Sequence, residues 1–221
     1  MNVTTASAGL QVLSAHRRLI DEVADLYRRA EGVGEPHATM LRAAALHLAQ
    51  FDLRSLRPGR GARKPACRHI PAALARAQSG PLRNLAEAFA AVEPGSDWSQ
   101  NPNYRVDRMG PEFLENYGYV ELVGPGRPVD SRTFLVGFLV LGPEMLYPDH
   151  SHRAAEVYHV VAGNAEWWRE RDDWTARAPG AVIAHAPAVR HAMRTRGEPL
   201  LALYCWQGEI AEFARLNTHE P

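Results

Sequence analysis

The stretch YPDHSHRAAEVYH, residues 147–159, gathers three histidines, one glutamate and two tyrosines in 13 residues. Successive side chains of a β-strand point to opposite faces, so residues two apart share a face. If the stretch is extended without a bulge near residues 153–155, one face carries four polar side chains: His150, His152, Glu156 and Tyr158. His159 then points the other way. Burying this polar face unpaired would be costly, and a metal ion inside a β-barrel would satisfy it.

A divalent transition metal ion is the cofactor that these side chains predict. Imidazole nitrogen and carboxylate oxygen suit Zn, Fe, Mn, Ni or Co, and the sequence does not choose among them. The expected ligands are His150, His152 and Glu156, with His191 joining from a neighbouring strand after APGAVIAHAPAVRH. Some metal sites of this type have only three protein ligands, and in that case His150 is the first to leave out. His185, before the proline turn, is expected to be structural, with a place near the pocket mouth as the alternative.

The charge balance gives no general argument for nucleic acid or an anionic membrane as a partner. The 221 residues contain 25 basic and 25 acidic side chains, and 46% are apolar, as in ordinary globular proteins. Cys67 and Cys205 lie outside any CxxC pattern, which fits free thiols in a reducing compartment. The N-terminal residues show no secretory signal, and no run of about 18 apolar residues indicates a transmembrane helix. The expected location is the cytoplasm.

The pattern of the chain changes near Trp98. Before it, apolar residues recur at three- and four-residue spacing, as in Leu19, Val23 and Leu26, which is typical of helices with one buried face. After it, short apolar runs alternate with glycine and proline, which favours a β-sandwich or barrel. We expect strands over residues 117–123, 133–141, 156–161, 165–170, 181–185, 191–195 and 200–206. The predicted protein is mainly β, with a helical N-terminal extension over 1–98, serving as a cap or homodimer surface, and a β-barrel domain over 99–221.

The histidine spacing resembles the cupin family. The first cupin motif has a glycine, then HxH, then a glutamate, then a second glycine, and it is matched by Gly142, His150, His152, Glu156 and Gly163. The gap after the first glycine is longer than usual by two residues. The second motif is matched by Gly180, Pro187 and His191, with Val189 where the family has a glycine. The resemblance covers roughly residues 136–206 and implies a small β-barrel of jelly-roll type.

A narrower resemblance comes from the tyrosines around this motif. The pattern Y-x-x-H-x-H-x-x-x-E-x-Y, residues 147–158, is similar to the cupin lyases of dimethylsulfoniopropionate (DMSP), which also carry a helical N-terminal region. It implies a carbon–sulfur lyase that cleaves DMSP by β-elimination into dimethyl sulfide and acrylate. A metal would hold the substrate carboxylate and stabilise the enolate-like charge. Tyr158 would be the base, as a phenolate favoured by the nearby cation, and Tyr147 would orient substrate or water.

The positive sulfonium of DMSP predicts aromatic side chains in the substrate site. A sulfonium has no N–H to donate, but cation–π attraction to an aromatic face contributes about 0.5–2 kcal/mol. The expected lining residues are Tyr104, Trp167, Tyr204 and Trp206, with ordinary core packing as the alternative for the tryptophans. Two other functions remain open: another metal-dependent cupin enzyme, such as a dioxygenase or isomerase, and a non-enzymatic cupin that senses a metal or small ligand.

Overall fold

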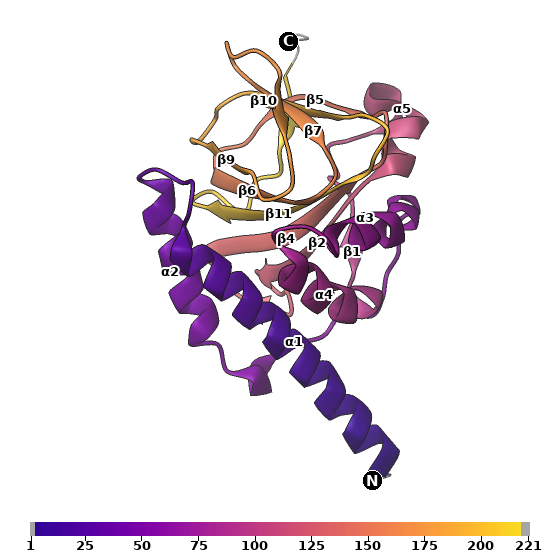
Figure 1. The fold of residues 1–221 in the computed structure, drawn as a ribbon, viewed down its shortest axis with the longest axis vertical. Helices are drawn as coiled ribbons and strands as arrows, with labels where there is room; N and C mark the ends of the chain where they lie inside the picture. The colour runs from indigo at the N-terminus through magenta and orange to yellow at the C-terminus, as the bar shows by residue number, and fades with distance from the viewer. Residues whose placement is uncertain (1–2, 218–221) are drawn as a thin grey trace.

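The computed structural model describes residues 3–217 and contains two β-sheets that face each other (Figure 1). Sheet A consists, in spatial order, of β1 (Trp98–Ser99), β2 (Tyr117–Gly124), β4 (Phe134–Leu141), β11 (Leu200–Gln207), β6 (Ala155–Ala162) and β9 (Val182–His185), with β3 (Val129–Asp130) beside β2. Sheet B consists of β12 (Arg215–Leu216), β5 (Leu146–Ser151), β10 (His191–Thr195), β7 (Ala165–Arg169) and β8 (Thr175–Arg177). From β4 to β11 the chain passes back and forth between the sheets, as in a jelly roll.

Helices cover the outer face of sheet A (Figure 1). They are α1 (Val3–Arg29), α2 (His37–Ala49), α3 (Ile70–Ala77) and α4 (Arg83–Val92), with the short helices η1 (Leu53–Ser55), η2 (Pro65–His69) and η3 (Glu93–Gly95). The predicted helical extension is thereby confirmed. A fifth helix, α5 (Val106–Asn116), lies where the sequence predicted no helix, and it is kinked at Gly110, whose φ is 73° before Pro111. None of the helices within residues 3–217 is long and apolar enough to cross a membrane.

Strand β4 shows why the helices and the barrel share one core. Its sequence, FLVGFLVL, is buried along its whole length. The side chains at positions 134, 136, 138 and 140 pack with the helices, and those at 135, 139 and 141 pack between the sheets. Phe138 stacks on Phe89 of α4 with ring centroids 3.8 Å apart, a pair that contributes about 0.5–1.5 kcal/mol beyond its buried area. Residues before and after position 98 therefore stabilise each other.

The histidine-rich stretch is not one continuous strand. Strands β5 and β6 lie on either side of residues 152–154, where the chain crosses from sheet B to sheet A. The predicted alternation of side chains between the two faces holds within β6. Glu156 and Tyr158 line the space between the sheets, whereas His159 points outward to Tyr27 of α1, with ring centroids 5.6 Å apart. The polar groups of β5 reach the same space because the two sheets face each other.

Candidate metal centre and substrate pocket

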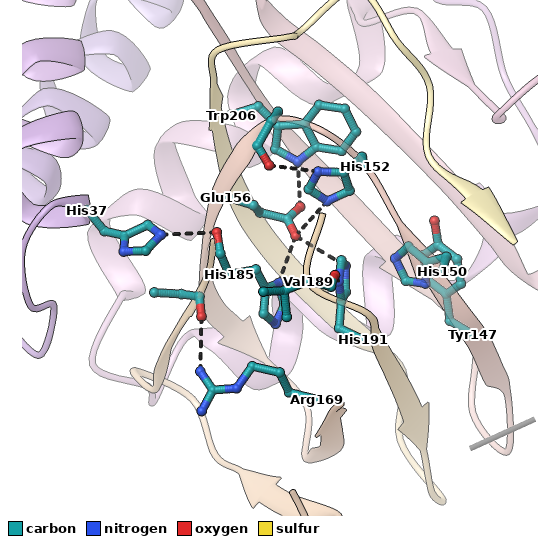
Figure 2. Close-up of polar contacts among 12 residues, drawn as sticks. His37, Tyr147, His150, His152, Glu156, Arg169, His185, Val189, His191 and Trp206 are labelled. Atoms are coloured by element: carbon teal, nitrogen blue, oxygen red, sulfur yellow. Dashed lines mark hydrogen bonds and ion pairs between the residues drawn. The ribbon is translucent and has the colours of Figure 1, made fainter. Parts of the chain in front are cut away.

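Strand pairing in sheet A places three polar side chains in one row. Trp206 of β11 is opposite Glu156 of β6, and Glu156 is opposite His185 of β9. From sheet B, His191 begins β10, and His152 lies in the link between β5 and β6. The side chains that surround Glu156 therefore come from both sheets and from the segment that joins them (Figure 2).

The Glu156 carboxylate is the centre of this cluster. Its Oε2 atom lies 3.0 Å from His185 Nδ1, 3.2 Å from His152 Nε2 and 3.4 Å from His191 Nε2. Its Oε1 atom accepts a hydrogen bond of 2.5 Å from the indole N–H of Trp206. One atom from each of His152, Glu156 and His191 lies within 4.8 Å of the other two, close enough for the three to share a metal ion.

The hydrogen bonds of the imidazoles fit a metal ion. His152 Nδ1 lies 3.0 Å from the Ala154 carbonyl oxygen, and His191 Nδ1 lies 2.9 Å from the Val189 carbonyl oxygen. A carbonyl only accepts, so each Nδ1 carries a proton and each neutral ring presents its Nε2 lone pair to Glu156. These lone pairs and the carboxylate repel each other unless a cation lies between them. His191 Nε2 is buried and makes no hydrogen bond within residues 3–217, as expected of a metal-binding nitrogen.

Burial keeps the imidazoles of His150 and His191 in the neutral form that binds metal. It holds the pKa of His191 well below its ordinary value and lowers the pKa of His150 to about 4. Burial alone would raise the pKa of Glu156, but the adjacent imidazoles, His152 first, hold it well below its usual range. An ionised carboxylate beside neutral imidazoles is the protonation state that binding of a divalent cation requires.

His185 belongs to this cluster, although the sequence favoured a structural role for it. It is fully buried, and its ring stacks on that of His191 with centroids 3.9 Å apart. Its backbone carbonyl accepts a hydrogen bond of 3.0 Å from the His37 side chain of α2, so the helical extension helps to fix the end of β9 (Figure 2). Only the pairing of β9 with β6 brings His185 beside Glu156, and the sequence pattern does not reveal that pairing.

A pocket lies beside the cluster, with Glu156 in its wall. Its lining within the described part of the chain is mostly aromatic or apolar and includes no arginine, lysine or histidine: Asn101, Tyr117, Tyr119, Glu121, Leu135, Leu139, Tyr147, Glu156, Tyr158, Tyr204, Trp206, Ile210, Glu212, Phe213 and Ala214. Of the aromatic residues expected at the substrate, Tyr204 and Trp206 are in this wall. Trp167 is not, because it is buried in the core with its ring centroid 6.1 Å from that of Tyr158.

His150 lies beside the three-residue donor group rather than within it (Figure 2). Its ring centroid is 4.1 Å from that of His191, and it stacks on Tyr147 at 4.0 Å. The hydroxyl groups of Tyr147 and Tyr104 are 2.8 Å apart, and both tyrosines are buried. Tyr104 thus holds Tyr147 in place and does not itself line the pocket.

Two facing sheets that enclose a histidine–glutamate cluster define the protein as a cupin, which confirms the expected fold class. A profile of the dimethylsulfoniopropionate lyase family matches residues 39–202. The chain belongs to this family.

Two curated relatives carry names from the same family. The chain is 29% identical over 146 residues to DddL of Cereibacter sphaeroides, a candidate DMSP lyase, covering 66% of this chain and 60% of that protein. It is 29% identical over 126 residues to the DMSP lyase DddQ of Ruegeria pomeroyi, covering 57% of this chain and 62% of that protein. The matches thus span about three fifths of the length of these relatives.

Solved structures show that the fold is shared along nearly the whole chain. The crystal structure of DddQ from Ruegeria pomeroyi superposes with a TM-score of 0.69 at 24% identity, covering 92% of this chain and 96% of that one. A chain from the crystal structures of the DMSP lyases RdDddP and RnDddQII gives 0.73 at 24% identity, covering 93% and 98%. Coverage this high includes most of the N-terminal helical region, so the helical cover on sheet A belongs to the shared fold.

Proposed function

We propose that the protein is a metal-dependent lyase that cleaves DMSP by β-elimination into dimethyl sulfide and acrylate. The observation that carries this proposal is the convergence of a metal-donor cluster and two tyrosines, Tyr147 and Tyr158, on one aromatic pocket. The pocket lining within residues 3–217 has no cationic side chain that could pair with the substrate carboxylate, so the metal centre is the proposed place for that group. The family to which the chain belongs agrees with this activity.

We assign the metal ion to His152, Glu156 and His191, with His150 as a further ligand. A bound divalent ion would hold the substrate carboxylate and stabilise the negative charge that develops on the adjacent carbon. Trp206 and His185 each contact one oxygen of Glu156 and so fix the orientation of this ligand. The donor set suits Zn, Fe, Mn, Ni or Co.

Tyr158 is the proposed base that removes the proton next to the carboxylate. The electrons of the broken C–H bond form the double bond of acrylate, and those of the C–S bond leave with neutral dimethyl sulfide, so the leaving group needs no acid. Burial raises the pKa of Tyr158 well above its ordinary value, and the Glu156 charge raises it further. A phenolate at this position therefore depends on positive charge at the metal centre. Tyr147, held by Tyr104, is proposed to orient the substrate.

A headspace assay tests this activity. Protein loaded separately with each of the five metals is incubated with DMSP, and dimethyl sulfide in the gas phase and acrylate in solution are measured. We expect the two products in equal amounts from at least one metal form. No dimethyl sulfide from any metal form would contradict the proposal, and oxygen uptake with a thiol or diketone substrate would instead indicate a dioxygenase.

The proposed role of His185 as a positioning residue gives a separate prediction. The substitution His185→Phe should weaken metal binding by about 10–100-fold, the usual effect of removing a group that orients a metal ligand. His185→Asn should recover part of the loss, because its amide N–H can donate to Glu156. Competition with a coloured chelator measures the affinity. The control is His159→Phe, a buried histidine on the opposite face of β6. Equal losses in His185→Phe and His159→Phe would show a general packing effect and contradict the role.

A further inference from the structure

Besides Glu156, two acidic side chains within residues 3–217 line the pocket, Glu121 and Glu212, and Glu121 is the one that lies on a strand of sheet A. Across sheet A, Glu121 of β2 is opposite Gly137 of β4, Gly137 is opposite Tyr204 of β11, and Tyr204 is opposite Tyr158 of β6. Three strand spacings of about 4.8 Å place Glu121 and Tyr158 about 14 Å apart along this row. Glu121, Tyr204 and Tyr158 all line the pocket. The row therefore runs from the proposed base to a carboxylate across the substrate space.

The glycine in this row leaves room for the Tyr204 side chain against the sheet. A Cβ atom at Gly137 would lie 2.8 Å from the Tyr204 hydroxyl oxygen, closer than real Cβ atoms approach such an atom. The Tyr204 ring thus occupies the space that a side chain at 137 would fill. Burial raises the pKa of the Tyr204 hydroxyl, and the strongest charge effect on it comes from Glu121. The carboxylate and the tyrosine therefore act on the same part of the pocket.

The ion pair of Glu121 does not remove its charge from the pocket. Arg127 lies 2.5 Å from Glu121, but its side chain is 38% exposed, whereas that of Glu121 is 7% exposed. Both partners of the ion pair line a surface groove on the outer side, together with Arg57 and Arg60, and of the two only Glu121 also lines the pocket. Water screens the guanidinium more than the buried carboxylate. A cation in the pocket is therefore nearer to the negative carboxylate of Glu121 than to the positive guanidinium of Arg127, which lies on the solvent side.

We propose that Glu121 and Tyr204 form a subsite for an onium group, a sulfonium or quaternary ammonium carried by a small carboxylic acid. An onium ion has no N–H to donate, so charge attraction and aromatic faces are what can recognise it. The pocket supplies both at this end and supplies anion-binding metal donors at the other. The identity of the natural ligand rests on the proposed function. The subsite adds a physical reason why the protein would bind a zwitterion more tightly than a carboxylic acid without positive charge.

Two unreactive ligands of the same shape test the charge preference directly. One is 3-(trimethylammonio)propanoate, and the other is 4,4-dimethylpentanoate, in which carbon replaces the charged nitrogen. Calorimetry on the metal-loaded protein should show at least about 10-fold tighter binding of the cationic ligand, a ratio that corresponds to about 1.4 kcal/mol. Glu121→Gln should reduce the ratio to below about 3-fold. Equal affinities in the unmodified protein, or no binding of either ligand, would overturn the proposal.

A matched control separates loss of this charge from loss of packing. Glu93 is also a buried glutamate paired with a half-exposed arginine, Arg63, but it lies outside the pocket. Glu93→Gln should therefore keep the wild-type ratio. If Glu121→Gln fails to fold, Tyr204→Leu provides the second test: it removes the aromatic face beside the carboxylate and should lower the ratio, and an unchanged ratio would count against the proposal. These experiments measure binding and not turnover. A protein that prefers the cationic ligand but shows no lyase activity would therefore contradict the proposed function and still support the onium subsite.

Discussion

Replacing Tyr158 with phenylalanine is expected to lower the rate of dimethyl sulfide release by about 10²–10⁴-fold, the usual contribution of a positioned acid or base. The phenyl ring preserves the packing against Tyr204 and Trp167, whose ring centroids each lie 6.1 Å from that of Tyr158. The variant loses only the hydroxyl group that would accept the proton. Initial rates from headspace gas chromatography, together with metal content by elemental analysis, check this result.

Tyr27→Phe is the control for the Tyr158 variant. Tyr27 is also a fully buried tyrosine and lies against sheet A, where its hydroxyl is 3.4 Å from the backbone oxygen of Tyr204. It packs on the outer side of the sheet, so its loss should leave the rate within about 3-fold, since a single weak hydrogen bond contributes little. A Tyr158→Phe variant that keeps its metal and its full rate would show that another group is the base.

The second large effect concerns the metal. Replacing His191 with alanine is expected to weaken metal binding by more than about 100-fold, because removing a group that merely orients a ligand already costs about 10–100-fold. The substitution removes a buried Nε2 that lies 3.4 Å from Glu156 Oε2. Lyase activity should fall together with metal content. Equilibrium dialysis against a metal buffer measures the affinity, and circular dichroism checks that the fold is retained.

Two further histidine variants complete this test. His150→Ala should also weaken binding by more than about 10-fold if His150 is the further ligand that we propose. His47→Ala should not, because His47 packs on Phe134 on the helix-covered side of sheet A, with ring centroids 5.9 Å apart. Full metal affinity in His191→Ala would contradict the assignment of the centre. Full affinity in His150→Ala would limit the protein ligands to three.

The fold class and the centre of the site were predictable because their signals lie close together in the sequence. The spacing from His152 to Glu156 and the alternation within β6 need only local geometry, so the outward position of His159 followed as well. The condition that the stretch over residues 147–159 is extended without a break is not met, since the chain changes sheets between β5 and β6. The site still formed because a link of three residues returns the chain to the same internal space.

The missed features depend on contacts between distant segments. His185 joins the cluster through the pairing of β9 with β6, and Glu121 reaches the pocket through three successive strand pairings. Neither residue is marked by local spacing. The helix over residues 106–116 was missed because the glycines and prolines after residue 98 favoured short strands, whereas Gly110 and Pro111 form a kink within a helix. The alternation of side chains along a strand also did not distinguish Trp206, which lies in the pocket wall, from Trp167, which lies in the core.

The origin of the metal donors in both sheets has a thermodynamic consequence. Glu156 belongs to sheet A, His191 to sheet B, and His152 to the segment that connects them. An ion bound by all three would cross-link the two halves of the barrel, and the unfolded chain would bind it far less well. At a free metal concentration 100 times the dissociation constant, such linkage contributes about 2.7 kcal/mol to the free energy of unfolding. The supply of metal would then set the fraction of molecules that remain folded, as well as the fraction with a complete site.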